Sequence, residues 1–397
     1  MSTRYPYFNQ SAINKVSKIL KSGKVNYWTG QECNRFEKEF SKYIGKKYSV
    51  TVSNGSVALE LAIKSLNLKK NDQIIVSPRS FIISASCVLN LGLKPIFADV
   101  DENGNLNIEG IKKVYRKNVK AIILVHLNGL PCDLDPIVKF VKKNKVFLIE
   151  DCSQAHGAIY KGKKAGSFGH ISTWSFCQDK IISTGGEGGM ISTNDKKLWL
   201  KLWSLKDHGK NYERVFVKKQ KIGFRWLHDY LGSNFRMTEM QASLGREQLK
   251  TLNSQVKRRN IIAKLYINKL SDYFKKYFIL KKINFKCQSC PLKQNLKKCT
   301  QCKHAYYRLN FYFNKKGIQK KIISQLNKKK ITCNVGACPE IYRETIFKKL
   351  NYFPKTRLQN AKRLGEISIA FPVDPYKSLT KIEKEIDNIK KTLNHFI

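Results

Sequence analysis

One lysine stands in a setting that suits covalent or acid–base chemistry. Lys180 follows a segment of small and apolar residues, 174–177, and precedes the glycine cluster at residues 185–189. Glycines in such a place let the backbone approach a ligand closely. Burial lowers the pKa of a lysine and makes its amine a usable nucleophile or base. Because lysines occur along the whole chain, an ordinary lysine is the competing interpretation.

Asp151 is the second candidate, because it closes an apolar run at residues 146–149 that is typical of a buried strand. A carboxylate there is costly to bury without a cationic partner. The protonated ring nitrogen of pyridoxal 5'-phosphate (PLP) is such a partner, and PLP needs it to act as an electron sink. On residue type alone, a helix N-cap or a structural salt bridge is the favoured interpretation.

The elements that must position these residues alternate in type. The alternation predicts an α/β fold with a mainly parallel sheet covered by helices on both faces. In such sheets the site gathers at the carboxyl ends of the strands, where Asp151 lies. The first strand leads through Ser53-Asn54-Gly55-Ser56 into a helix, which is an arrangement that cradles a phosphate. The expected strands are 48–52, 73–76, 95–99, 121–126 and 146–149, and the expected helices are 57–66, 81–90, 108–115 and 134–143.

The second part of the chain has a different composition. Residues 238–270 predict one or two long helices, and residues 306–313 predict a strand. We therefore place a domain boundary near residue 250. This gives a large domain, 1–250, and a smaller α+β C-terminal domain, 251–397, which carries a Cys- and Lys-rich insert at residues 285–303.

The insert contains two closely spaced cysteine pairs, Cys287-x2-Cys290 and Cys299-x2-Cys302, with eight residues between them. Two such pairs can supply four thiolates to a tetrahedral zinc ion, so a structural zinc that braces the smaller domain is the favoured hypothesis. Unligated thiols, an iron–sulfur cluster or a redox pair are the alternatives, although the spacing does not match the ferredoxin run. His304 could be a spare ligand, but a surface histidine is the simpler interpretation.

The formal charge of +46 raises the question of a nucleic-acid partner. The chain shows no basic arm, helical recognition module or aromatic RNA-binding signature, so we expect that nucleic acid is not the main ligand. The positive field would attract a substrate that carries a diphosphate. No run of about 18 or more uncharged apolar residues predicts a membrane span. No secretory signal stands at the start, so we expect a cytoplasmic protein.

Several spaced motifs occur in an order that resembles one family, the PLP-dependent sugar aminotransferases of the DegT/DnrJ/StrS type, which have the fold-type-I architecture. The resemblance covers nearly the whole chain and implies PLP as the cofactor. The motifs are Thr29-Gly30, Phe36-Glu37, Ser53-Asn54-Gly55-Ser56, Phe81, the run 150–157 (EDCSQAHG), Gly166-Ser167-Phe168-Gly169, Ser175-Phe176 with Lys180, the run 185–190 (GGEGGM), His208-Gly209 and the run 232–237 (GSNFRM).

The resemblance also implies roles for individual residues. Lys180 is expected to form the Schiff base, and Asp151 to pair with the pyridine nitrogen. Asn234 is expected to contact the phosphate in the neighbouring subunit, which implies a homodimer with shared active sites. His156 is expected to be structural, and the roles of Glu187 and Arg236 stay open. The other expected cofactor contacts are Gln154 near the phenolic oxygen, Phe81 stacked on the ring, and Gly55, Ser56 and Ser175 at the phosphate.

The activity that follows is transamination. A dehydratase branch of the family has histidine in place of the lysine, whereas position 180 is lysine here. We therefore expect a nucleotide-linked keto-sugar to become an amino-sugar, with L-glutamate as the amino donor, in surface-polysaccharide, lipopolysaccharide or other glycan biosynthesis. The alternatives are a keto-cyclitol aminotransferase, a PLP-dependent sugar dehydratase, or, from another class, a basic zinc-containing nucleic-acid-binding protein.

Overall fold

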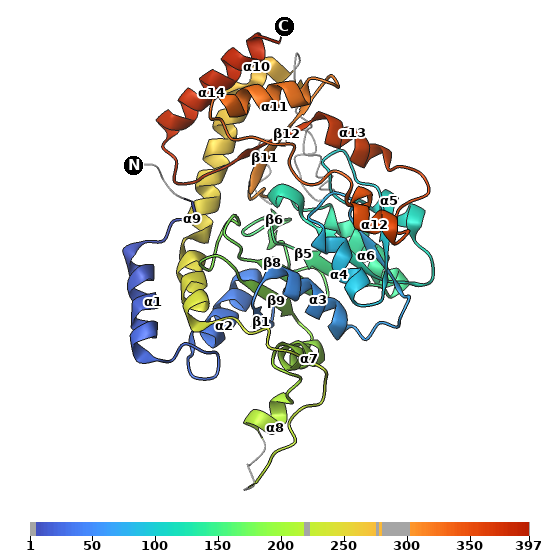
Figure 1. Cartoon of the computed structure of the whole chain (residues 1–397), viewed down its shortest axis with the longest axis vertical. Helices are drawn as coiled ribbons and strands as arrows, with labels where there is room; N and C mark the ends of the chain where they lie inside the picture. The colour runs from blue at the N-terminus through green and yellow to red at the C-terminus, as the bar shows by residue number, and fades with distance from the viewer. Residues whose placement is uncertain (1–4, 218–222, 275–277, 280–301, 397) are drawn as a thin grey trace.

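The computed structural model describes residues 5–217, 223–274, 278–279 and 302–396. Its largest sheet has seven strands: β1 (Tyr48–Val52), β2 (Gln73–Val76), β3 (Lys94–Phe97), β4 (Val119–Val125), β5 (Phe147–Asp151), β8 (Ile171–Ser175) and β9 (Gly189–Thr193). Their order is β1-β9-β8-β5-β4-β2-β3 (Figure 1). Strands β8, β5, β4, β2 and β3 are parallel, and β9 runs antiparallel to both neighbours. The predicted α/β class with a mainly parallel sheet is confirmed.

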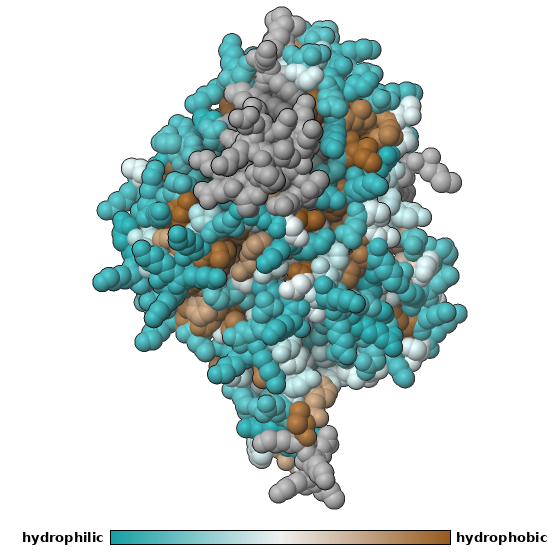
Figure 2. All heavy atoms as spheres, turned by 180° about the vertical axis from the view of Figure 1, so that it is seen from behind, coloured by the Kyte–Doolittle hydropathy of each residue, from teal (hydrophilic) through white to brown (hydrophobic). Residues whose placement is uncertain are grey.

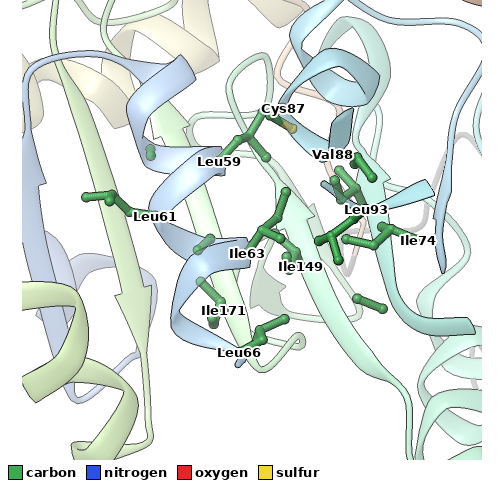
Figure 3. Packing of buried hydrophobic residues seen from close by; sticks show 14 of the residues in the cluster. Leu59, Leu61, Ile63, Leu66, Ile74, Cys87, Val88, Leu93, Ile149 and Ile171 are labelled. Atoms are coloured by element: carbon green, nitrogen blue, oxygen red, sulfur yellow. The ribbon is translucent and has the colours of Figure 1, made fainter. Parts of the chain in front are cut away.

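Helices cover both faces of this sheet because its side chains alternate between the faces. On β2, Ile74 packs into one cluster and Ile75 into another on the opposite face. Figure 3 shows the first cluster, in which Ile63 of a helix lies beside Ile149 of β5. The first face is covered by α3 (Gly55–Ser65), α4 (Ile83–Asn90) and α7 (Lys196–Lys206), and the second by α2 (Glu32–Ile44), α5 (Ile108–Val114) and α6 (Leu134–Asn144).

The C-terminal part has its own core around a three-stranded antiparallel sheet with the order β10-β11-β12. Its strands are β10 (Phe278–Ile279), β11 (Arg308–Phe313) and β12 (Ser368–Pro372). The helices around it are α10 (Ser271–Phe274), α11 (Gln319–Lys328), α13 (Gln359–Ile367) and α14 (Leu379–Asn394). Helix α12 (Thr345–Lys349) instead packs Phe347 into the first cluster on the large sheet. Helix α1 (Gln10–Ser22) lies near the start of the chain. The short elements are β6 (Ile159–Tyr160), β7 (Lys163–Lys164), η1 (Leu127–Gly129) and η3 (Ile341–Arg343).

One long helix, α9 (Glu239–Lys269), links the two parts (Figure 1). Thr238 and Gln241 form a capping box at its start, which fixes where the helix begins. It contacts α1 and α2 of the large part and α14 of the C-terminal part. The helix runs without a break through residue 250, so the domain division placed there stays a prediction.

A projecting arm presents large exposed hydrophobic side chains. It consists of residues 208–217 and 223–235, includes α8 (Tyr212–Phe216), and extends from the body at the bottom of Figure 1. Its exposed side chains include Phe224, Trp226 and Leu231 at 81–87% exposure. In the opposite view hydrophobic residues lie on the same arm, next to the body of the molecule, whereas most of that face is hydrophilic (Figure 2). None of the described helices is both long and apolar enough to cross a bilayer.

Candidate active site

The carboxyl edge of the parallel sheet brings the sequence-predicted residues together. Asp151 closes β5 and pairs with Thr173 of β8, and Ser175 closes β8. Gly55 opens α3 directly against Ser175, and Lys180 follows in the loop after β8. This edge is where parallel α/β sheets place their ligands, because the loops that follow the strands diverge there.

Gly55 and Ser175 form a cradle of the kind that holds a phosphate. A Cβ atom at Gly55 would lie 2.6 Å from the Ser175 Cβ and 3.1 Å from its Oγ, so only glycine permits this approach. The Asn54 side chain accepts a hydrogen bond from the Val57 N–H and caps α3, while Ser56 lies in its first turn. A helix N-terminus presents backbone N–H groups and a positive dipole end to an anion. The cradle therefore fits the phosphate of PLP.

The Asp151 carboxyl is buried at the end of β5, with 5% of the residue exposed. Its Oδ1 accepts a hydrogen bond of 3.1 Å from the Ser153 N–H. Burial raises the pKa of Asp151, and this effect exceeds the opposing effects of Ser153, Lys180 and His126. Within the described residues, no lysine or arginine forms an ion pair with this carboxylate. A cationic ring nitrogen would supply the missing partner, so Asp151 also fits PLP.

Lys180 is charged and paired in this structure. Its Nζ lies 2.8 Å from the Asp179 Oδ1 and 3.5 Å from the Tyr307 hydroxyl. Burial lowers the pKa of Lys180, but Tyr307 and Asp179 outweigh that effect and hold the pKa above its ordinary value. The expectation of a lowered pKa is therefore wrong for this form, because it considered burial without the partners that the fold supplies.

Gln154 and Phe81 lie in the loops that follow β5 and β2. The Gln154 Oε1 accepts a hydrogen bond of 2.7 Å from the Asn128 N–H, which fixes the side chain beside η1. Phe81 precedes α4 rather than opening it, and 69% of the residue is exposed. An exposed ring at a strand end is available to stack on a flat ligand, and this role of Phe81 stays a prediction.

Asn234 is exposed and belongs to the arm, while the carbonyl of its neighbour Phe235 accepts a hydrogen bond of 2.8 Å from the Ser53 N–H. Its Oδ1 accepts a long hydrogen bond of 3.4 Å from the Arg236 N–H. Arg236 pairs with Asp207 at 2.6 Å, and the Glu187 carboxylate lies 3.5 Å from the Cys177 thiol. The arrangement leaves Asn234 exposed, and its role at the phosphate of a neighbouring subunit stays a prediction.

His156 and His304 are both enclosed by neighbouring groups. His156 is fully buried between the rings of Trp174 and Phe176, and burial lowers its pKa to about 3, which fits the structural role expected for it. His304 is partly buried, stacks on the Tyr306 ring at 3.9 Å and accepts a hydrogen bond from its N–H. The interpretation of His304 as a plain surface histidine is therefore wrong, because its ring packs against Tyr306 and lines a hollow between the two parts of the chain.

Of the four cysteines proposed to bind zinc, the structure describes one, Cys302. Cys287, Cys290 and Cys299 lie outside the described residues, and Cys302 accepts a hydrogen bond from the Lys161 N–H at 3.3 Å. The zinc site stays a prediction.

Three buried groups in the described chain have ligand atoms close enough for a metal: His126, Glu150 and Cys152. Hydrogen bonds already occupy two of them. The His126 Nε2 lies 3.0 Å from Glu150, and its Nδ1 accepts from the Cys132 N–H at 3.1 Å. Glu150 also accepts from the backbone N–H groups of the 166–169 turn. His126 and Glu150 therefore form a satisfied structural network that ties the turn to β4 and β5.

Three residues at the site were missed by sequence reasoning: Asp179, Tyr307 and Arg308. Tyr307 donates a hydrogen bond to Asp179, and Arg308 lies 3.9 Å from the same carboxylate. Asp179 adjoins Lys180 in the chain, which is a signal that could have been used. Tyr307 and Arg308 belong to the C-terminal part, and only the fold brings them to Lys180.

Comparisons with known proteins match the chain to one family and one fold. A model of the DegT/DnrJ/EryC1/StrS aminotransferase family matches residues 6–390. GDP-perosamine synthase of Escherichia coli O157:H7 is 37% identical over 66% of this chain and 70% of its own length. An aminotransferase from Psychrobacter cryohalolentis has a similar structure, with a TM-score of 0.93, 40% identity and 99% of both chains covered. GDP-4-keto-6-deoxy-D-mannose-3-dehydratase of E. coli, solved with bound hydrated PLP, has a TM-score of 0.83 and 27% identity, covering 97% of this chain and 98% of that one.

Proposed function

The chain belongs to the DegT/DnrJ/EryC1/StrS aminotransferase family and is a PLP-dependent aminotransferase, and we propose that it converts a nucleotide-linked keto-sugar to an amino-sugar with L-glutamate as the amino donor. The support for the substrate class comes from relatives such as GDP-perosamine synthase. The strongly positive chain would favour a substrate that carries a diphosphate. Biosynthesis of a surface polysaccharide or another glycan is the pathway that we propose.

One observation supports the catalytic assignment most directly: Lys180, Asp151 and the Gly55–Ser175 cradle lie at one edge of one sheet. Bound PLP supplies an electron sink for the carbanion that forms when the donor loses its α-proton. In our proposal Asp151 keeps a proton on the ring nitrogen, and the cradle with Ser56 holds the phosphate. Lys180 would hold the cofactor and then, as a free amine, accept the α-proton and return it.

Transamination is favoured over dehydration because position 180 is lysine. The dehydratase of E. coli has the same fold and binds PLP, so the fold alone does not separate the two reactions. A lysine amine can bind the cofactor covalently and also carry the proton between the two carbon atoms. We therefore keep dehydration as the second candidate, to be tested on the same protein.

The exposed arm supports a homodimer with shared sites. Phe224, Trp226 and Leu231 present apolar surface that a monomer leaves in water. Asn234 lies near the base of the same arm. We propose that a second copy covers the arm and that Asn234 reaches the phosphate cradle of that copy.

The test begins with the absorption spectrum of the purified protein with PLP, recorded before and after addition of L-glutamate. A visible band that is lost on adding L-glutamate supports the first half-reaction, and the band should be absent in K180A. Nucleotide-linked keto-sugars are then supplied to the aminated form, and the products are identified by mass spectrometry. An amino-sugar product supports the proposal, whereas a deoxygenated sugar without nitrogen would favour the dehydratase. Absence of any band in the wild-type protein would contradict the catalytic assignment.

A further inference from the structure

Arg79 is a cation buried without an anion. It lies just beyond β2, two residues before Phe81, and none of its surface is exposed. Its Nη1 makes one long hydrogen bond, 3.5 Å to the Ala361 carbonyl of α13. Its Nε and Nη2 have no hydrogen-bond partner among the residues that the structure describes. A buried charge in this condition is costly, so its position calls for a partner.

The acidic side chains around Arg79 are already engaged. Glu340 interacts with Arg79 electrostatically, but its carboxylate is bound by the Arg357 guanidinium at 2.6 and 2.8 Å. Asp99 accepts hydrogen bonds from the N–H groups of Asn360 and Ala361 at 3.0 Å each, at the start of α13. Neither carboxylate forms an ion pair with Arg79 within the described part of the chain.

A second unpartnered group lies close by, at Asn310 of β11. Its Oδ1 and Nδ2 are both shielded from solvent and form no hydrogen bond of good geometry with the described residues; the polar group that its amide meets is the Tyr312 hydroxyl. Asn310 lines a hollow between the two parts of the molecule, together with Leu127 and Tyr312. The Tyr312 hydroxyl interacts with the charge of Arg79, which places both unpartnered groups at the same seam.

Gly104 connects the guanidinium to this hollow. A Cβ atom there would lie 3.1 Å from the Leu127 Cδ2, which lines the hollow, and 3.2 Å from the Arg79 Nε. Its φ of +89° also favours glycine. Gly104 therefore lies between the unpartnered Nε of Arg79 and Leu127 in the wall of the hollow, and a larger residue would not fit there.

The hollow also borders the catalytic residues. Asn128 and Arg308 are part of its lining. The Asn128 N–H donates to Gln154, and Arg308 lies 3.9 Å from Asp179, the partner of Lys180. A ligand that extends from the catalytic edge into the seam would therefore pass these groups on its way to Arg79.

We propose that Arg79 and Asn310 form a recognition site for a carboxylate at this seam. The Nε and Nη2 groups of an arginine form one edge of the guanidinium, which matches the two oxygens of a carboxylate. The Asn310 amide can donate to the same carboxylate and accept from a neighbouring hydroxyl or amine. The inference rests on the proposed function: the carboxylate belongs either to the amino donor or to an acidic sugar substrate.

A purely structural role explains Arg79 poorly. Replacing a buried and uncompensated charge with an apolar side chain of similar length is often neutral or stabilising. Arg79→Met should therefore fold at least as well as the wild type, and this separates binding from folding. Arg79→Lys retains the charge but lacks the two-nitrogen edge, so it tests the geometry of recognition.

The experiment uses the PLP-loaded enzyme and measures the shift of the thermal midpoint with glutarate, which represents the donor's distal carboxylate, and with D-glucuronate, which represents an acidic sugar. D-Glucose serves as the uncharged control. For the carboxylate that stabilises the wild type, we expect affinity to fall at least tenfold in R79M, less in R79K, and severalfold in Asn310→Leu. Arg363→Met, an arginine near the same seam that faces Glu102, should bind as the wild type does.

Stabilisation by glutarate alone assigns the site to the amino donor, and stabilisation by D-glucuronate alone assigns it to the sugar. Wild-type affinity in R79M, or no response of the wild type to either carboxylate, overturns the proposal. The proposed function is tested by a different measurement, the cofactor band and its loss on addition of L-glutamate. If that band behaves as expected while R79M binds carboxylates normally, the function stands and this site falls.

Discussion

The ammonium of Lys180 lies 2.8 Å from the carboxylate of Asp179, its neighbour in the chain. Tyr307 donates a hydrogen bond to the same carboxylate and stands 3.5 Å from the ammonium. The pKa of Asp179 is lowered: burial raises it, but the hydrogen bond and charge of Lys180 outweigh that effect. The pair is therefore ionised, and Lys180 must give up a proton and this contact before its amine can attack a carbonyl.

Replacing Asp179 with asparagine should accelerate capture of PLP by the cofactor-free protein near neutral pH. The pKa of Lys180 is held above its ordinary value by Tyr307 and Asp179 against the effect of burial, so removal of the negative charge lowers it. A larger fraction of the amine is then neutral, and capture should be about 3–10-fold faster, since each pKa unit changes that fraction tenfold. Stopped-flow absorbance of the lysine-bound cofactor, followed across the alkaline range, measures the effect.

Tyr307→Phe is the matched control for D179N near neutral pH, because burial raises the pKa of the Tyr307 hydroxyl and the group removed there is neutral. We expect the pH profile of capture to move toward lower pH in D179N and to move less in Y307F. Identical profiles in D179N and the wild type would mean that Asp179 does not set the charge of Lys180.

Asp151→Asn should stabilise the cofactor-free protein and destabilise the loaded protein relative to wild type. Burial raises the pKa of Asp151 in the folded state. Its contribution to stability is therefore fully present below its unfolded pKa and is lost as pH rises through the folded pKa. At neutral pH the substitution removes the cost of burying the ionised carboxyl. The free energy of unfolding should therefore rise by ~1 kcal/mol for each pKa unit of the shift.

With PLP bound, we expect Asp151→Asn to lower stability instead. A carboxylate can pair with a protonated ring nitrogen, whereas an amide cannot hold that proton. Thermal unfolding of both forms, with and without PLP, measures the two effects. We also expect kcat to fall by ~10²-fold or more, as when a positioned electrostatic partner is removed. A D151N protein that is less stable without PLP would assign Asp151 a structural partner instead.

Gly55→Ala should weaken PLP binding by displacing Ser175 from the cradle. The new Cβ would lie 2.6 Å from the Ser175 Cβ, and forcing such a contact costs about 1–3 kcal/mol. Ser175→Gly in the same chain removes the clash, so the double variant should recover part of the stability lost in G55A. Fluorescence titration with PLP and thermal unfolding of the four proteins give the coupling. Additive effects of the two substitutions would show that Gly55 and Ser175 do not meet.

The cradle residues 53–56 and Asp151 could be predicted from the sequence, because each depends on a short stretch of consecutive residues. An apolar run such as 146–149 must end at the edge of a parallel sheet, and residues 53–56 join a strand directly to a helix. Tyr307 lies 128 positions from Asp179, and Arg79 lies 282 positions from Ala361. Such contacts depend on how the two parts of the chain pack, and no periodicity or motif reports that packing.

The arm of residues 208–217 and 223–235 leads to a prediction about which subunit supplies Asn234. K180A and Asn234→Asp should each be inactive when assayed alone. The first variant lacks the catalytic amine, and the second lacks the contact to the phosphate. If Asn234 acts across the interface, a mixed dimer holds one site with Lys180 from one subunit and Asn234 from the other. Random exchange of subunits then restores about a quarter of the sites.

Activity of the mixture, measured after subunit exchange has been verified with two differently tagged proteins, decides the question. If Asn234 acts within its own chain, every site in the mixture lacks one of the two residues and activity stays at the level of the separate variants. Leu231→Asp provides the control, because a charge on this 87% exposed apolar side chain should prevent pairing and therefore abolish the recovery. Recovery that persists in L231D would place the subunit contact elsewhere than on the arm.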